Sequence, residues 1–239
     1  MPQNPLMNPE SLSAALIVVD QQIDFQPGGT LPVPGGDQIV EGICELMHKF
    51  KTIVLSQDSH PYGHISFASS HKGKKPYDIL SLDDLNNSNF ESLFSKDCLK
   101  NYLLSIPLHQ QVLWPDHCVP GTVGWGFDPR LPVDKADLIL RKGKRLDCDS
   151  YSAFQENDGR STGLAGYLRE KSINTLYVVG LAGDYCVNWS AHDAALLGFE
   201  VIYDFSLTRF VDSDPVNTKQ IIQRLKKSGV HVEEDTSPA

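Results

Sequence analysis

The feature of this sequence that most constrains its fold is a series of short apolar segments, each ending where polar or charged residues begin. Ala14–Val19 contains no polar side chain and is followed directly by Asp20. Uninterrupted apolar runs of this length are typical of strands that are buried on both faces, as in parallel sheets. Further strands are predicted at residues 51–56, 112–114, 136–140, 173–179 and 201–205, with an edge strand at 230–232.

Helical patterns alternate with these predicted strands. Asp37 is expected to cap a helix in which Ile39, Ile43, Leu46 and Met47 share one apolar face. Other helices are predicted at residues 89–104, 164–171, 186–197 and 215–228. This order favours an α/β protein, a three-layer, doubly wound, Rossmann-like fold. We expect a mostly parallel central sheet of about six strands flanked by helices.

Strand and helix signals weaken between residues 68 and 110, where Ser, Asn, Lys and Asp dominate. We interpret this segment as an insertion in a single domain of residues 14–235. A polar N-terminal arm, residues 1–13, precedes that domain.

Charge and cysteine content narrow the class of protein. With 30 acidic and 21 basic residues the net charge is -9, so the surface would repel nucleic acid and anionic lipid. No apolar run is long enough to span a bilayer, and the N-terminus lacks the pattern of a signal peptide. The five cysteines include no Cys-x-x-Cys pair, which favours free thiols. We therefore expect a cytoplasmic protein that binds neither nucleic acid nor a membrane.

Cys186 is the candidate nucleophile. It follows the predicted strand at 173–179 and a turn with two glycines, where a helical pattern begins. The unpaired N–H groups and the dipole at the start of a helix favour a thiolate. The structural alternative is a core cysteine, because free cysteine is among the most buried residue types.

Asp20 and Lys142 are the candidate partners of Cys186, because each also follows a predicted strand. The carboxyl ends of parallel strands meet at one edge of a sheet, where ligands bind. A carboxylate would accept the thiol proton, and an ammonium would favour the thiolate and lower the thiol pKa. A helix-capping Asp and a solvated loop Lys are the structural alternatives.

Asp58, His60 and His64 form the pattern Asp-x-His-x-x-x-His, which brings one oxygen and two imidazoles into a short loop. Such a set can begin a Zn, Fe or Mn site. Two residues are candidates for a fourth ligand. We prefer His117, in a loop directly after a predicted strand, to His71, whose polar neighbours indicate exposure to solvent.

Seven segments carry a resemblance to a known family. The chain resembles the nicotinamidase (pyrazinamidase) branch of the isochorismatase-like cysteine hydrolases, and the matching segments follow the family order along nearly the whole chain. They cover residues 18–25, 28–36, 57–67, 114–118, 142–143, 149–154 and 180–187. The Asp-x-His-x-x-x-His and Trp-Pro-x-His-Cys pieces are the most specific, since they separate metal-bearing nicotinamidases from relatives that share only Asp, Lys and Cys.

The resemblance implies an isochorismatase-like fold and a metal-dependent amidohydrolase. Such an enzyme converts nicotinamide to nicotinate and ammonia in NAD salvage, and acts on pyrazinamide as well. In the family mechanism Cys186 attacks the carboxamide carbon to form an acyl-thioester, Asp20 accepts and later donates a proton, and Lys142 holds the pair ionised. The backbone N–H groups of Ala182 and Cys186 form the oxyanion hole, and a cis peptide bond precedes Ala182.

The resemblance also implies one divalent metal ion. Asp58, His60, His64 and His117 would bind it, and the ring nitrogen of the substrate would replace a water on it. Zinc is expected first, with iron and manganese as alternatives.

Four residues are implied to form the substrate pocket. Phe25 and Trp114 match positions that wall the substrate ring in the family, and Tyr151 and Leu181 complete the pocket. Flat apolar walls suit an aromatic substrate.

The chain departs from the family pattern at Ile23, where Asn is frequent, at Arg141, and in the length of the segment that follows Phe67. These departures leave open whether the insertion covers the site or mediates assembly, as a monomer or a homo-oligomer. A related cysteine amidohydrolase for carbamoyl or ureido substrates is the nearest alternative function. A non-catalytic metal-binding module of the same fold is the alternative from another class.

Asp184 lies two residues before Cys186 and would raise the thiol pKa if its carboxylate pointed at the sulfur. We therefore expect Asp184 to face away and to cap the helix through the Val187 N–H.

Overall fold

Six strands form one sheet in which all neighbouring strands are parallel. The computed structural model describes residues 11–233. The strands of this sheet are β1 (Ala14–Val19), β2 (Ile53–Asp58), β5 (Leu138–Lys142), β6 (Thr175–Leu181), β7 (Glu200–Arg209) and β8 (His231–Glu233). Their order in the sheet is β5-β2-β1-β6-β7-β8. The predicted parallel sheet of about six strands is confirmed.

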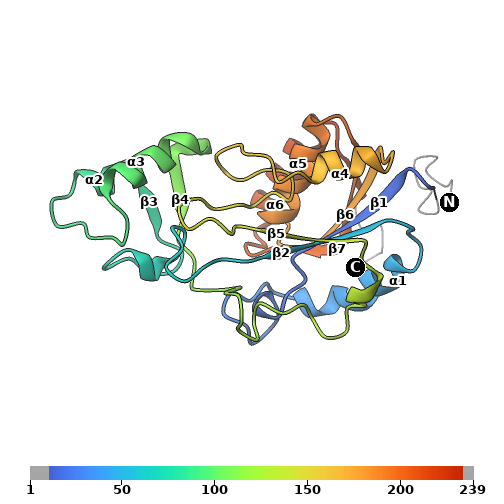
Figure 1. Ribbon diagram of the computed structural model, residues 1–239, viewed down its shortest axis with the longest axis horizontal. Helices are drawn as coiled ribbons and strands as arrows, with labels where there is room; N and C mark the ends of the chain where they lie inside the picture. Colours follow the sequence, from blue (N-terminus) through green and yellow to red (C-terminus); the bar gives the residue numbers. More distant parts are fainter. Residues whose placement is uncertain (1–10, 234–239) are drawn as a thin grey trace.

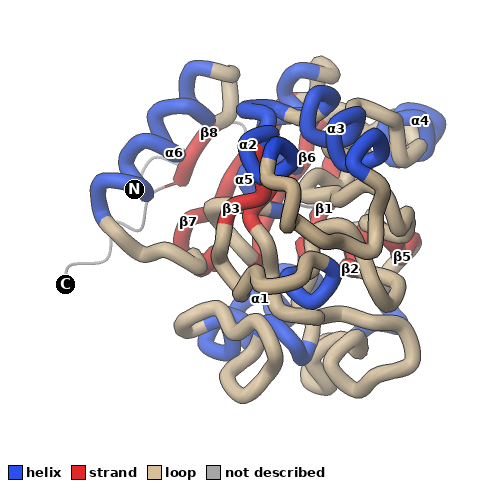
Figure 2. Tube along the Cα trace, turned by 90° about the vertical axis from the view of Figure 1, so that its left-hand side faces the viewer, coloured by secondary structure: helices blue, strands red, loops and turns tan. Residues whose placement is uncertain are grey.

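Helices cover both faces of the sheet, as expected for a doubly wound fold (Figures 1 and 2). One face packs on α1 (Val40–Met47), and the other packs on α4 (Leu164–Glu170), α5 (Cys186–Leu196) and α6 (Pro215–Lys227). Asp37 was expected to cap the first helix, but it lies inside a 3-10 turn, Gly36–Ile39, that leads into α1. That prediction was wrong because the left-handed Gly35, not a capping side chain, starts the turn.

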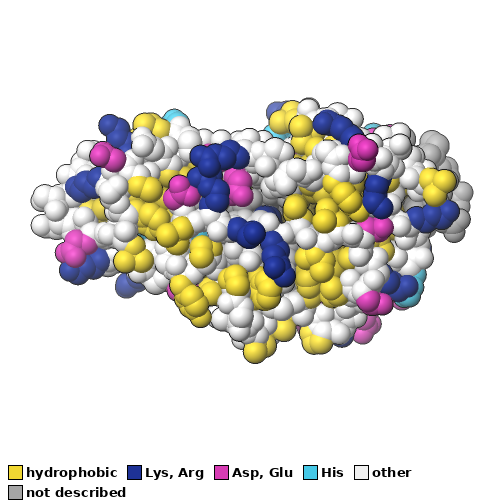
Figure 3. Space-filling model, in the orientation of Figure 1, with side chains coloured by type: hydrophobic (Ala, Val, Ile, Leu, Met, Phe, Trp, Pro, Cys, Tyr) yellow, Lys and Arg dark blue, Asp and Glu magenta, His cyan; other side chains and the backbone are white. Residues whose placement is uncertain are grey.

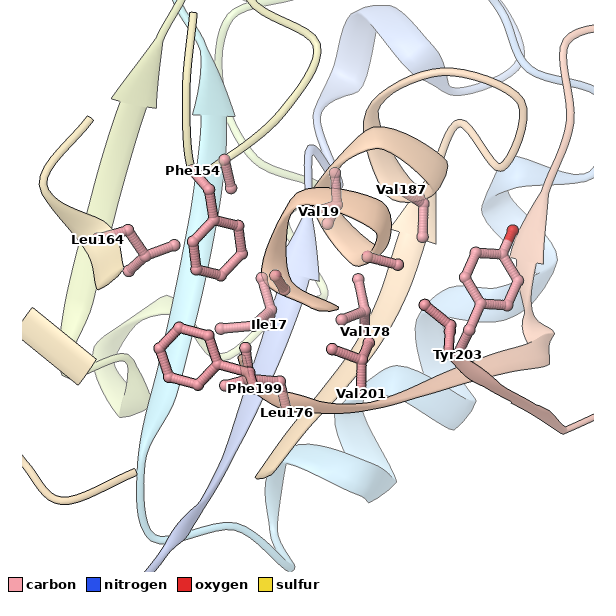
Figure 4. Close-up of a cluster of buried hydrophobic side chains, with 14 of the residues drawn as sticks. Ile17, Val19, Phe154, Leu164, Leu176, Val178, Val187, Phe199, Val201 and Tyr203 are labelled. Carbon is pink, nitrogen blue, oxygen red and sulfur yellow. The ribbon is translucent and has the colours of Figure 1, made fainter. Parts of the chain in front are cut away.

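The core is divided into two layers by the alternation of side chains along the strands. In β1, Ile17 and Val19 face the layer below α5, whereas Leu16 and Val18 face the layer around α1. Figure 4 shows Ile17, Val19, Val178 and Val187 converging between the sheet and a covering helix. Because β1 and β6, at the centre of the sheet, are buried on both faces, they need apolar side chains at nearly every position, which explains their uninterrupted runs.

Among the strands that extend further than the sequence indicated, β2 and β5 matter for the site. The prediction ended them at residues 56 and 140, but β2 continues to Asp58 and β5 to Lys142. Asp58 and Lys142 are therefore direct partners in the parallel β2–β5 ladder. Their pairing depends on strand register, which the local pattern does not specify.

The predicted insertion forms a side lobe, which we define as residues 71–112, at one end of the molecule (Figure 1). The side lobe contains β3 (Ile79–Ser81), α2 (Leu82–Asn86), α3 (Lys96–Ser105) and β4 (Gln110–Val112). Strands β3 and β4 pair as a separate antiparallel ribbon. The expected helix at 89–104 was wrong in its first half, because the Ser95 side chain caps α3 at the Cys98 N–H.

The side lobe also corrects the placement of His71. This residue was expected to be exposed, but it is 1% exposed and stacks between Phe90 and Phe94. Its Nε2 lies 2.8 Å from the Ile65 carbonyl oxygen and its Nδ1 2.9 Å from Ser92 Oγ. The prediction was wrong because it used only the polar residues next to His71 in sequence, whereas a segment about twenty residues later, with Phe90 and Phe94, packs on the His71 ring.

Short 3-10 turns complete the described residues, at Ile23–Phe25, Gly36–Ile39, Ala68–Ser70, Pro107–His109 and Val133–Lys135. Most of the predicted N-terminal arm lies outside the described residues, and the boundaries 14–235 stay a prediction. Within residues 11–233, none of the helices has the length and hydropathy of a membrane span.

Candidate active site

Four strands of the sheet deliver polar side chains to the same edge. Asp20 follows β1, Asp58 and Lys142 end β2 and β5, and Cys186 follows β6 after a short turn. The chain winds from β1 in one direction and from β6 in the other, so β1 and β6 flank the switch point of the sheet. Ligands of open α/β sheets bind at this point. The candidates that the sequence placed at strand ends are therefore brought together.

Lys142 is the centre of this group. Its Nζ lies 2.8 Å from Asp20 Oδ2, 2.6 Å from Asp58 Oδ1 and 3.3 Å from Cys186 Sγ, and it donates to the Ser150 carbonyl oxygen at 3.0 Å. Both Lys142 and Asp20 are at most 1% exposed. A buried ammonium needs close acceptors for its three N–H groups, because its desolvation is otherwise too costly.

Burial and mutual charge shift the pKa values of Lys142, Asp20 and Asp58. Burial opposes the charge on Lys142, but Asp20 and Asp58 raise its pKa well above the usual range, so that it remains an ammonium. Burial raises the pKa of Asp20, and neighbouring Asp58 raises it further against the effect of Lys142. Burial also opposes ionisation of Asp58, but Lys142 and His60 hold the pKa of Asp58 well below its usual range.

The thiol of Cys186 differs from the expectation. Burial raises its pKa well above the usual range, and Lys142 offsets this only in part. A thiolate would add a third negative charge around a single ammonium, beside Asp20 and Asp58, in a dry site. The thiol therefore keeps its proton at rest and loses it by transfer to a neighbouring base, and Asp20 is the carboxylate in place to accept it.

The turn before Cys186 exposes backbone N–H groups. Helix α5 starts at Cys186, and the peptide bond between Leu181 and Ala182 is cis, as predicted. Within residues 11–233 the N–H groups of Ala182 and Cys186 have no hydrogen-bond acceptor. By contrast, the Tyr185 and Val187 N–H groups both donate to the Ala182 carbonyl oxygen. Two unpaired donors beside a thiol are suited to binding a developing oxyanion.

Asp184 faces away from Cys186, but it does not cap α5. Its carboxylate accepts hydrogen bonds from the Val211 N–H at 3.0 Å and the Asp212 N–H at 2.8 Å. The predicted capping of the Val187 N–H was wrong, because that group already donates to Ala182. Asp184 instead ties the turn to the segment that follows β7.

Three side chains converge on one point beside Lys142. His60 Nε2 and His117 Nε2 lie 3.3 Å and 3.7 Å from Asp58 Oδ2, and all three residues are buried. His60 Nδ1 is 3.0 Å from the Gly143 carbonyl oxygen and His117 Nδ1 is 2.8 Å from the Pro115 carbonyl oxygen. These backbone contacts place the proton on Nδ1 and leave the Nε2 lone pairs for a metal.

The donor set fits a divalent metal ion. One carboxylate oxygen and two imidazole nitrogens are ligands that Zn, Fe and Mn accept, and a three-ligand set leaves positions open for a substrate. Against burial, Asp58 raises the pKa of His60 to about 8, which means that this point favours a cation. Gly143 allows the arrangement, since a Cβ on it would lie 2.4 Å from the His60 ring and its φ is +65°.

His64 is placed differently from the other three predicted metal ligands. Its ring lies beside that of His60, with centroids 4.3 Å apart. However, its Nδ1 is 2.8 Å from Ser66 Oγ and its Nε2 is 3.2 Å from the Cys148 carbonyl oxygen. It groups with His60 and Asp149, not with Asp58 and His117. Burial lowers the pKa of His64 to about 3.

Asp149 and Gln111 are site residues that the sequence did not single out. Asp149 is 1% exposed, and its Oδ1 lies 3.9 Å from His60 Nε2. Gln111, from β4 of the side lobe, donates to Asp149 Oδ2 at 3.2 Å and to the Tyr151 hydroxyl at 3.0 Å. Asp149 begins one of the segments that carry the family resemblance, which was the available signal.

Asp24 is a further residue that was missed. Its carboxylate accepts a hydrogen bond from the Cys118 N–H at 2.6 Å, and the Cys118 carbonyl oxygen accepts from the His60 N–H. This chain of bonds fixes the loop that carries His117.

A cavity with aromatic walls opens onto the reactive groups. We call it the reaction cavity; Phe25, Leu31, Trp114, Tyr151, Ala182, Tyr185 and Val211 line it together with Cys186, Asp58, His60, His117 and Asp149. Trp114 and Tyr185 meet edge to face with ring centroids 4.8 Å apart. Of the residues predicted for the substrate pocket, Phe25, Trp114 and Tyr151 line this cavity, and Tyr185, which the sequence did not single out, lines it as well. Leu181 is not among the lining residues, since its side chain packs beside Gly36 in the core.

Comparison with known proteins identifies the relatives of this chain. The sequence matches the isochorismatase domain family over residues 14–234. It is 43% identical over 219 residues to a nicotinamidase of Acinetobacter baylyi, and the match covers 91% of each chain.

Solved structures show the same arrangement of elements. A nicotinamidase/pyrazinamidase of Acinetobacter baumanii superposes with a TM-score of 0.81 at 38% identity, covering 95% of this chain and 98% of the other. A pyrazinamidase of Pyrococcus horikoshii in complex with zinc superposes with a TM-score of 0.68 at 31% identity, covering 93% and 99%.

Proposed function

The chain belongs to the isochorismatase family, in its nicotinamidase branch, and from this membership we propose that it hydrolyses nicotinamide to nicotinate and ammonia in NAD salvage. The observation that carries the proposal is one buried cluster in which Lys142 touches both Cys186 and Asp58. A nucleophile and a set of metal ligands thus face the same aromatic cavity. We extend the proposal to pyrazinamide, because it differs from nicotinamide by one further nitrogen in a ring of the same size.

Cys186 is the nucleophile and Asp20 the proton carrier of this reaction. As Sγ attacks the carboxamide carbon, the thiol proton passes to Asp20, whose raised pKa makes its carboxylate a stronger base. The N–H groups of Ala182 and Cys186 hold the oxygen of the tetrahedral intermediate. Asp20 then protonates the leaving nitrogen, ammonia departs, and the acyl group stays on sulfur as a thioester.

Hydrolysis of the thioester uses the same groups in reverse roles. Asp20 takes a proton from water, the hydroxide oxygen attacks the thioester carbon, and the C–S bond breaks. The proton on Asp20 returns to sulfur, so that Cys186 regains its thiol. The product leaves as nicotinic acid and loses its remaining proton to solvent to give nicotinate. Lys142 keeps its positive charge throughout and balances the negative charge that moves between Asp20 and Cys186.

Asp58, His60 and His117 are proposed to hold one divalent metal ion, with zinc first among the candidates. When bound, the ion would supply a ligand position for the ring nitrogen of the substrate and so orient the carboxamide toward Cys186. The zinc complex of the Pyrococcus horikoshii pyrazinamidase supports this choice. His64 stays a proposed fourth ligand only if its Nε2 leaves the Cys148 carbonyl oxygen.

The aromatic walls of the reaction cavity are proposed to hold the pyridine ring. Phe25, Trp114, Tyr151 and Tyr185 present flat apolar surfaces in the cavity that the reactive groups also line.

Release of ammonia from nicotinamide by the purified, zinc-loaded protein tests the proposal. We expect turnover of nicotinamide and pyrazinamide and none of benzamide, which has no ring nitrogen. Protein that carries stoichiometric metal but releases no ammonia from nicotinamide would show the proposal to be wrong. Turnover of N-carbamoyl compounds in its place would assign the chain to the carbamoyl-hydrolysing relatives.

A further inference from the structure

A second cavity lies behind the aromatic wall of the reaction cavity. We call it the rear cavity; it has a volume of about 200 Å³ and lies between the segment 106–112 of the side lobe, the loop 151–157 and α5. Figure 1 shows the side lobe, that loop and α5 meeting along one side of the molecule. None of the groups assigned to catalysis or metal binding lines it.

The walls of the rear cavity are mostly apolar and include three aromatic side chains. Tyr151, Tyr185 and Trp189 line it together with Ile106, Pro107 and Leu108. Leu108 is 88% exposed and marks the open end. Figure 3 shows other hydrophobic side chains gathered over the side lobe and the centre of one face. A cavity of this size with flat apolar side chains in its lining suits a small aromatic ligand.

The charged lining of the rear cavity has one sign. Glu156 and Asp193 line it, and no Lys, Arg or His does. Glu156 Oε2 is buried and has no hydrogen-bond partner within residues 11–233. Buried carboxylate oxygens in native proteins are almost always paired, so Glu156 lines the cavity with a carboxylate that has one oxygen without a donor.

Neighbouring basic residues do not fully balance the negative charge of Glu156 and Asp193. Burial raises the pKa of Glu156, and Arg145 offsets this only in part. Burial likewise raises the pKa of Asp193, against its contacts with Ser152 and Gln155 and the charge of His192. Both directions are those of carboxylates that lack a close cation. Arg224 lies over the Trp189 ring at 5.5 Å, outside the lining residues.

We propose that the rear cavity is a second ligand site, for a small aromatic cation such as an N-alkylpyridinium or N-alkylquinolinium. The aromatic side chains would stack on its ring, and Glu156 and Asp193 would balance its charge. A quaternary ring nitrogen has no lone pair, so such a ligand cannot take the metal position of the reaction cavity. The site is therefore distinct in its chemistry from the one proposed for the amide substrate.

Occupancy of the rear cavity acts on the reaction cavity through shared walls. Tyr151 and Tyr185 line both cavities. The Tyr151 hydroxyl accepts hydrogen bonds from Trp114 Nε1 at 3.3 Å and from Gln111 Nε2 at 3.0 Å. A ligand in the rear cavity that moves Tyr151 would therefore act on Trp114 directly and on Asp149 through Gln111.

Equilibrium dialysis with N-methylquinolinium and its neutral isostere 1-methylnaphthalene tests the site. The two probes have the same shape and differ by one positive charge. We expect the protein to bind the cation at least about tenfold more tightly, and Glu156→Gln to reduce this ratio at least threefold without affecting the isostere. Equal affinity of the two probes, or an unchanged ratio in Glu156→Gln, would overturn the proposal.

Two further variants serve as controls for the dialysis experiment. Glu170→Gln removes one negative charge from the exposed end of α4 and should leave the ratio as in the wild-type protein. Asp193→Asn serves as the second test of charge if Glu156→Gln does not fold. A crystal structure of the N-methylquinolinium complex should place the ring against Tyr151 and Trp189. Density in the reaction cavity alone would refute the second site.

The link between the cavities has its own readout, which does not depend on amidase activity. Peptide mass spectrometry would follow the rate at which iodoacetamide alkylates Cys186, with and without saturating N-methylquinolinium. A change of at least twofold is expected, and an equal rate would disprove the link.

Discussion

The buried cluster around Lys142 has two halves, which we call the nucleophile half (Asp20 and Cys186) and the metal half (Asp58, His60 and His117). The polar atoms of the two halves differ in how they are bonded to the protein. In the nucleophile half, both oxygens of Asp20 contact protein groups, since Oδ1 accepts from Ser56 Oγ at 2.7 Å and Oδ2 forms an ion pair with Lys142 Nζ at 2.8 Å. In the metal half, the imidazoles of His60 and His117 use only Nδ1 on the protein. Their Nε2 atoms point to Asp58 Oδ2 at distances longer than a good hydrogen bond.

This difference suits the nucleophile half to proton transfer and the metal half to binding a cation. A paired carboxylate and thiol around one ammonium can exchange a proton without exposing charge to a dry site. Lone pairs that converge on a point without a protein donor are instead suited to an added cation. Lys142 joins the halves, because its charge is shared by Asp20 and Asp58.

Cys186→Ala breaks the nucleophile half alone and should have the largest effect. We expect turnover of nicotinamide to fall by about 10⁴-fold or more, because the thioester cannot form. Metal content, measured by atomic emission, should stay near one ion per chain. Residual activity of a tenth or more would remove Cys186 from the role of nucleophile, and loss of metal would show that the halves are not separable.

Lys142→Met damages both halves, because it leaves two buried carboxylates without their shared cation. Loss of one partner of a buried ion pair costs about 3–5 kcal/mol, so the free energy of unfolding in urea should fall by that order. Lys144→Met removes an exposed charge two residues away and is the matched control. If both variants were equally stable, Lys142 would not hold the cluster together.

His60→Ala, compared with His64→Ala, sharpens the boundary of the metal half. Removal of His60 should weaken zinc binding at least about 100-fold, since a ligand is lost. Removal of His64 should weaken it less than about tenfold, because its Nε2 already contacts the Cys148 carbonyl oxygen. Competition with a fluorescent zinc chelator measures both. Equal losses would make His64 a full ligand.

Gly143→Ala perturbs the metal half without touching a ligand. The added Cβ would meet the His60 ring at 2.4 Å, so we expect the ring to shift and zinc binding to weaken about tenfold. The control is Gly166→Ala in α4, where a Cβ would meet nothing within 4 Å. Unchanged zinc affinity in Gly143→Ala would mean that the position of His60 is not held by this contact.

Local sequence patterns predicted the structure of the side lobe poorly. Its sequence signals were weak, and the expected helix at 89–104 and the expected exposure of His71 were both wrong. Yet β4 of this lobe brings Gln111 to Asp149 and leads directly into Trp114. Short elements with little amphipathic pattern are stabilised by what they pack against, which a local window does not contain.

The sequence by itself determined the parallel sheet, the strand ends at which Asp20, Lys142 and Cys186 lie, and the Asp-x-His-x-x-x-His pattern. These features depend on neighbours a few residues away, through backbone periodicity and loop spacing. Only the tertiary structure decided that Asp58 pairs with Lys142, that burial raises the pKa of the Cys186 thiol, and that His64 turns toward Cys148. Register, dehydration and ring orientation are set by segments far apart in the chain, so they exist only once the whole sheet and its side lobe have packed.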